Sequence, residues 1–69
     1  MARFLTLADV AEELAVSVAQ VRVLVRTGEL PAIQVGGRNQ WRVETTSLED
    51  YIQRQYARNQ ARIEAEHGS

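Results

Sequence analysis

Residues 6 to 28 read TLADVAEELAVSVAQVRVLVRTG, and this stretch decides the fold. Thr6 stands where a helix N-cap is expected, and Asp9 is placed to complete a capping box with it. Residues 15 to 17 interrupt the helical pattern, so the first helix is expected to end there. Its apolar side chains have the spacing i, i+3, i+4 and i+7 of an amphipathic helix, and they are Leu7, Val10, Ala11 and Leu14.

A second helix is predicted from Val18 to about Arg26. Ser17 is a good N-cap, and Gly28 favours the left-handed conformation that ends helices. The face of this helix that is expected to meet the core holds Val18, Val21, Leu24 and Val25. The opposite face holds Ala19, Arg22, Val23 and Arg26.

After Gly28 the apolar period changes from helical to two. Residues 33–35 (Ile-Gln-Val) and 41–43 (Trp-Arg-Val) each alternate, and we expect their side chains to point inward, outward and inward. The five residues between them contain two glycines, which predicts a β-hairpin. A third helix is then predicted from a cap at Thr46 or Ser47 to about Glu64.

Two helices separated by a three-residue turn form the helix-turn-helix unit, whose second helix enters the major groove of DNA. On the outer face of that helix, Arg22 and Arg26 lie one turn apart, where they can reach guanine edges or phosphates. Val23 is placed to meet a thymine methyl group, and Gln20 to address an adenine edge. A solvated helix surface is the alternative. We favour DNA contact because like charges four residues apart destabilise an isolated helix.

The hairpin is expected to serve as a wing. Glycines at its tip let the backbone approach a ligand closely, and Arg38 there can enter a minor groove or meet a phosphate. Arg42 is expected to point outward, opposite Trp41, which we assign to the core. The full set of predicted DNA-binding residues is Ser17, Ala19, Gln20, Arg22, Val23, Arg26, Arg38, Asn39 and Arg42.

The composition argues against an enzyme. The 69 residues are 45% hydrophobic and 25% charged, which is typical of one soluble globular domain spanning residues 1–69. With no cysteine and a single histidine, His67, we expect no metal site, no cofactor and no catalytic site. We find no membrane-spanning run and no secretory signal, so we expect a cytoplasmic protein with no membrane partner.

The net charge of −1 hides a basic middle. Residues 18–42 carry four arginines against one glutamate, whereas acidic residues outnumber arginines in the segments before and after. This distribution suits a protein that presents one face to a polyanion, although random scatter of charge is the alternative.

Residues 4 to 53 resemble the excisionase-type, MerR-like winged helix-turn-helix family. The resemblance implies a mainly α fold with a small β-hairpin, and it leaves residues 54–66 as a C-terminal helical extension. It also implies a small transcriptional regulator that binds double-stranded DNA or, alternatively, an excisionase-like accessory factor for site-specific recombination. A protein-interaction module without DNA binding is kept as a second alternative. The resemblance rests on TLADVAEELAVS (6–17), Val21, Leu24, Val25, GELPA (28–32) and Val35-Gly36.

One recognition helix and one wing read only a few base pairs, so specificity requires several protomers or a second protein. The extension offers only Tyr56 and Ile63 as large apolar side chains, too few for a coiled coil. We therefore expect a monomer that associates head to tail and cooperatively on DNA, with a recombinase or the transcription machinery as a possible further partner. Arg54, Arg58 and Arg62 form a row that we expect to be solvated, with phosphate contact as the alternative.

Overall fold

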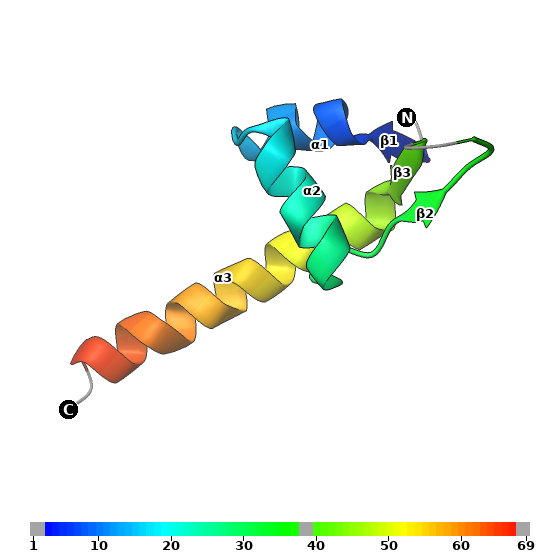
Figure 1. The fold of residues 1–69 in the computed structure, drawn as a ribbon. Coiled ribbons are helices and arrows are strands. Elements are labelled where there is room, and N and C mark those ends of the chain that lie inside the picture. The colour runs from blue at the N-terminus through cyan, green and yellow to red at the C-terminus, as the bar shows by residue number, and fades with distance from the viewer. Residues whose placement is uncertain (1–2, 38–39, 68–69) are drawn as a thin grey trace.

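The computed structural model describes residues 3–37 and 40–67 of the chain. It has three helices and a small antiparallel sheet, which confirms the mainly α fold with a β-hairpin (Figure 1). The elements in chain order are β1 (Phe4–Thr6), α1 (Leu7–Leu14), α2 (Val18–Thr27), β2 (Ile33–Gln34), β3 (Trp41–Glu44) and α3 (Thr45–His67).

The sheet has three strands in the order β1-β3-β2, not the two strands of the predicted hairpin alone. The strand that the sequence did not reveal is β1, which pairs with β3 in the register Phe4↔Glu44. Its three residues are too few for an alternation to be recognised, and its partner lies some forty residues further along the chain. The predicted hairpin itself is present, with Gln34 opposite Trp41.

The predicted inward orientation of Ile33 and Val35 is wrong. Their exposed fractions are 49% and 48%. The helices pack chiefly on β1 and β3, and β2 is an edge strand beyond them. The alternation of apolar and polar residues therefore separated the two faces of β2 correctly, but the helices cover neither face.

Local signals at the helix ends behave as the sequence predicts. The Asp9 backbone N–H donates to Thr6 Oγ1 at 3.0 Å, and the Thr6 N–H donates to Asp9 Oδ2 at 3.1 Å, which completes the capping box. Gly28 ends α2 in the left-handed conformation, with φ of 85°. Ala15 ends α1 with φ of 56°, a conformation that is unfavourable for a residue with a Cβ atom.

The core lies between the sheet and the corner formed by α1, α2 and the turn that joins them, which we call the helical corner. Of the predicted core face of α2, Val21 is fully buried and Leu24 and Val25 are half-buried. Val18 is 38% exposed, contrary to prediction, because it is the first residue of α2 and lies at the rim of the turn. Trp41 packs against the core, as expected. The buried residues are Leu7, Val10, Ala11, Val21, Leu30, Val43 and Leu48.

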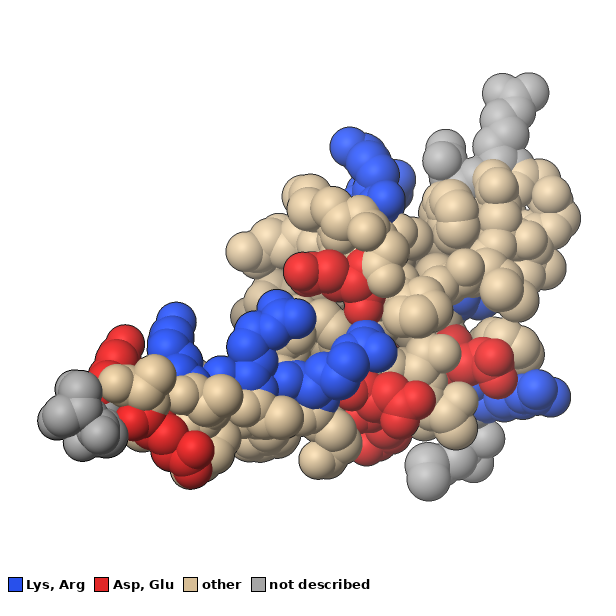
Figure 2. All heavy atoms as spheres, turned by 90° about the horizontal axis from the view of Figure 1, so that it is seen from below, with Lys and Arg blue, Asp and Glu red and all other residues tan. Residues whose placement is uncertain are grey.

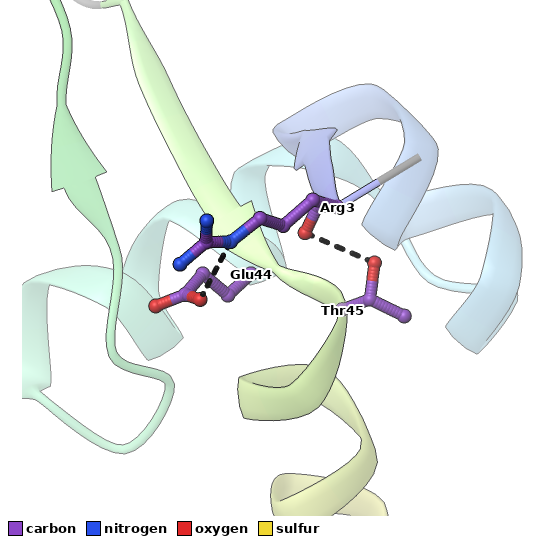
Figure 3. A network of polar contacts seen from close by, with 3 residues as sticks. All are labelled: Arg3, Glu44 and Thr45. Atoms are coloured by element: carbon purple, nitrogen blue, oxygen red, sulfur yellow. Dashed lines mark hydrogen bonds and ion pairs between the residues drawn. The ribbon is translucent and has the colours of Figure 1, made fainter. Parts of the chain in front are cut away.

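The third helix begins at Thr45, directly after β3, and not at the predicted cap of Thr46 or Ser47. The backbone N–H and the hydroxyl of Thr45 both donate to the carbonyl oxygen of Arg3, the residue just before β1, and Figure 3 shows the hydroxyl bond. These bonds hold the start of the helix beside the start of β1. Beside it, Arg3 forms an ion pair with Glu44 at 3.4 Å.

α3 is much longer than the core that it supports. Its 23 residues extend over about 34 Å, and residues 56–66 are all exposed. Figure 1 shows this part of α3 projecting away from the rest of the molecule. The whole molecule therefore measures 51 Å in its longest dimension against 24 and 19 Å in the other two. We call residues 56–66 the overhang.

Candidate nucleic-acid interface

The turn between α1 and α2 sets the direction of α2. The Val16 and Ala15 backbone N–H groups donate to the carbonyl oxygens of Ala11 and Glu12, which closes the end of α1. Ser17 then caps α2, because its hydroxyl accepts the Gln20 backbone N–H at 3.1 Å. The two caps fix the angle at which α2 leaves the turn and hence the side chains that it exposes.

The predicted outer face of α2 is exposed. Ala19, Arg22, Val23 and Arg26 all lie on the surface, and 52% of the Val23 side chain is accessible. Within the part of the chain that the structure describes, neither Arg22 nor Arg26 forms a hydrogen bond or ion pair. Both guanidinium groups are therefore free to bind an anionic or acceptor-rich ligand.

Arg22 and Arg26 adjoin the sheet. Together with Leu7, Val25 and Trp41, they line an open recess of about 430 Å³ between α2 and β3. The basic side of α2 and the strand that carries the hairpin therefore form one continuous surface. This is the arrangement that a recognition helix and a wing require.

Val23 and Gln20 lie on the other flank of α2. They line an apolar groove of about 490 Å³ between the helical corner and α3. The other residues of this α2–α3 groove are Leu14, Val16, Leu24, Tyr51 and Gln55. Val23 is thus at the border between the basic surface and an apolar one.

Gln20 has a structural role that the sequence interpretation missed. Its Oε1 atom accepts the Ser17 backbone N–H at 3.2 Å, which completes a second capping box. The spacing Ser-x-x-Gln was the signal that could have revealed it. With Oε1 engaged, Gln20 has only its Nε2 group available, whereas the bidentate pairing with adenine needs both atoms.

Three of the predicted DNA-binding residues belong to the hairpin segment. Two of them, Arg38 and Asn39, lie outside the described residues. The hairpin closes just before them, where the Val35 N–H donates to the Gln40 carbonyl oxygen at 2.8 Å. Gly36 has a φ of 67°, which favours glycine at this position.

Arg42 is not brought together with Arg22 and Arg26. It lies on the face of β3 opposite Trp41, half-buried beside Ile33 and Glu44. Its Nη1 atom donates to the Trp41 carbonyl oxygen at 2.8 Å, and its Nη2 atom to Gln40 Oε1 at 3.3 Å. These bonds hold the guanidinium against the hairpin.

Across residues 3–37 and 40–67, no three His, Cys, Asp or Glu side chains gather closely enough to hold a metal ion. In those same ranges, no helix combines the length and apolar character needed to cross a membrane.

A comparison with known protein families agrees with the arrangement of α1 and α2 described above. Residues 4–56, more than half of the chain, match the family model described as a helix-turn-helix domain, an excisionase-like family. The matched range exceeds the expected family-like core of residues 4–53 by three residues. The match supports the excisionase-type resemblance and indicates DNA binding, but it does not establish MerR-like specificity. The comparisons with curated proteins and with solved structures found no match.

Proposed function

The chain belongs to the helix-turn-helix domain family, and we propose that it binds double-stranded DNA sequence-specifically, with α2 in the major groove and the β2–β3 hairpin as a wing. The observation that carries this proposal is the pair Arg22 and Arg26. Both are exposed on the outer face of the second helix, both are free of partners among the described residues, and both adjoin β3. An arginine fork in this position matches the two acceptors of a guanine edge.

The remaining predicted residues have supporting roles in this proposal. Ser17 and Ala19 lie at the start of α2, where exposed backbone N–H groups favour phosphate. Val23 meets a thymine methyl group at the border of the basic surface. Arg38 and Asn39, which lie outside the described residues, also contact DNA in this proposal. Arg42 contacts the DNA backbone from the outer face of the hairpin after release from Gln40.

We propose that the protein is a small transcriptional regulator in the cytoplasm. The excisionase-like family match supports a second candidate, an accessory factor for site-specific recombination. The two candidates differ in the location of the binding sites. A regulator binds beside promoters, whereas an accessory factor binds beside the crossover site of a recombinase. Sequences selected by the protein from a random duplex pool, then located in the source genome, distinguish them.

We further propose that the protein is a monomer in solution and associates head to tail on directly repeated sites. The core of residues 4–53 reads too few base pairs for one copy to be specific. In the extension of residues 54–66, Tyr56 and Ile63 are the exposed large apolar side chains, too few for a stable coiled coil. Sedimentation without DNA and mobility shifts on duplexes with one, two and three sites test both halves of the proposal.

A protein-interaction module is the competing function, and the apolar α2–α3 groove is the observation in its favour. Fluorescence anisotropy with selected and random duplexes separates the two. DNA binding predicts that log affinity falls linearly with log salt, with a slope of about −0.9 for each phosphate contacted. If the selection yields no enriched sequence and the affinity for every duplex is low and indifferent to salt, the DNA-binding proposal is wrong.

A further inference from the structure

α3 carries a row of arginines that extends into the overhang and that the proposed recognition surface does not use. Arg54, Arg58 and Arg62 recur every four residues, so they follow one side of the helix. Figure 2 shows basic side chains succeeding one another along one side of α3, with acidic side chains at the left end of the row and next to its right end. From sequence alone we favoured a solvated row, and three features of the structure now favour a bound one.

The first feature is the direction of the row. Tyr51 and Gln55 face the helical corner, because both line the α2–α3 groove. Arg58 follows Tyr51 by seven residues and Arg62 follows Gln55 by seven, and a shift of two turns changes the direction by only about 20°. The face of α3 that borders the α2–α3 groove therefore continues beyond the domain as Arg58 and Arg62. These two arginines are turned toward the flank of α2 that carries Gln20 and Val23.

The second feature is the point at which the row begins. The Nη2 atom of Arg54 donates to the Glu29 carbonyl oxygen at 2.8 Å. Glu29 comes directly after Gly28, the residue that ends α2, so the row starts at the C-terminal end of the recognition helix. Arg54 is used to hold this junction, which leaves Arg58 and Arg62 for a ligand.

The third feature is that no arginine of the row forms an ion pair with a described acidic residue, although Asp50 and Glu66 continue its four-residue spacing at the two ends. Arg3–Glu44 is the one ion pair between described residues, so no arginine of α3 forms one there. Arg62 reaches only the neutral Asn59 Oδ1 atom, at 3.5 Å, and Glu64 is bonded to Gln60 instead. Like charges four residues apart destabilise a helix, and a polyanion lying along the row would remove that repulsion.

We infer that Arg58 and Arg62 bind the phosphates of the duplex just beyond the base pairs that α2 reads. The inference rests on the proposed DNA binding. The rise from Arg54 to Arg62 is about 12 Å, which corresponds to three or four base pairs at 3.4 Å each. The overhang therefore lengthens the stretch of DNA that the protein contacts, on one side of the site that α2 reads. Because phosphate contacts carry no base information, it raises affinity without changing the preferred sequence.

The test uses the full chain and a selected duplex whose flanks are lengthened by five base pairs, first on one side and then on the other. The variant R58Q/R62Q removes two charges from the row, and glutamine has nearly the same helix propensity as arginine. The control Q53E/Q60E lowers the net charge by the same amount on the opposite side of α3. Circular dichroism verifies that the helix content of both variants is unchanged.

For the wild type, we expect lengthening to raise affinity on one side only, by about tenfold at 0.1 M salt. R58Q/R62Q loses this gain, and its log–log salt slope is smaller by about two, whereas Q53E/Q60E keeps the gain. If R58Q/R62Q still binds the selected site but keeps both the gain and the slope, the inference is wrong and the proposed function stands. If the wild type itself binds no selected duplex, the proposed function fails and the inference fails with it.

Discussion

Thr45 donates two hydrogen bonds to a single oxygen atom, the carbonyl of Arg3, from its backbone N–H at 2.8 Å and from its hydroxyl at 3.1 Å. The pair joins the residue just before the first strand to the start of the longest helix, 42 residues away in sequence (Figure 3). Removing the hydroxyl leaves the carbonyl with one donor fewer at the start of α3.

We therefore expect Thr45→Val to lower the free energy of unfolding by about 0.5–1.5 kcal/mol, the usual net contribution of a hydrogen bond. In a domain of this size, each kcal/mol corresponds to roughly 4–8 °C in Tm. Thermal unfolding followed by circular dichroism measures the change. The matched control is Thr46→Val, one residue on and exposed, which should alter Tm little. Equal effects of the two substitutions would assign the loss to the exchange of a hydroxyl for a methyl group at the start of α3 and not to the bond with Arg3.

Ala15 predicts a stabilising substitution. Its φ of 56° and ψ of 44° place a Cβ atom in the left-handed region, which costs about 1–2 kcal/mol. Glycine removes that strain but is more flexible in the unfolded chain by about 0.4–1 kcal/mol. The expected result of Ala15→Gly is a rise of several tenths of a kcal/mol up to about 1 kcal/mol in unfolding free energy, measured by urea denaturation.

The control for this substitution is Ala8→Gly, in the first turn of α1, where glycine should destabilise by up to about 1 kcal/mol. Opposite signs at the two alanines would identify the backbone conformation as the cause. A loss of stability at both positions would contradict the strain assigned to Ala15.

A substitution of Gln20 tests separately the N-terminal cap of α2 and the proposed DNA-binding surface. Glutamate at this position retains the oxygen that accepts the Ser17 N–H and complements the positive end of the helix dipole. We expect Gln20→Glu to leave Tm unchanged or slightly higher. The added negative charge lies beside the start of α2, so DNA affinity should fall on selected and random duplexes alike. Unfolding and anisotropy are measured on the same sample, and undiminished affinity would place this end of α2 away from the duplex.

The helices and their ends could be predicted because the signals are local. Thr6 with Asp9, and Gly28, act within one turn of the residues they organise. The exposure of Arg22 and Arg26 followed in the same way from the period of the helix. Such positions depend on neighbours that a single sequence displays directly.

The parts that could not be predicted depend on distant segments. β1 forms only because Phe4 pairs with Glu44 of β3, and the sequence near Phe4 contains no pattern that predicts this pairing. The assignment of Trp41 to the core and of Arg42 to the opposite face of β3 was correct. The sequence did not reveal that Arg42 is half-buried beside Ile33, because Ile33 lies on another strand.

Arg22 tests whether the recognition surface reads bases or only holds phosphates. Arg22→Lys keeps the charge but loses the planar fork that makes two bonds to guanine O6 and N7. On the selected duplex we expect a loss of about 1–3 kcal/mol of binding free energy, and on random duplexes a much smaller one. Because the charge is conserved, the salt slope should be nearly unchanged. Anisotropy titrations at three salt concentrations on both duplexes measure these quantities.

The control for base reading is Arg3→Lys, which makes the same chemical change just before β1, where Arg3 pairs with Glu44 and not with a proposed ligand. It should leave both affinities within twofold of the wild type. Arg22→Ala completes the set, because it removes the charge as well and should lower the salt slope if the guanidinium also neutralises a phosphate. Equal losses for Arg22→Lys on selected and random duplexes would make Arg22 a phosphate contact. Base reading by α2 would then rest on Arg26, whose own lysine variant, measured on the same duplexes, should show the loss confined to the selected site.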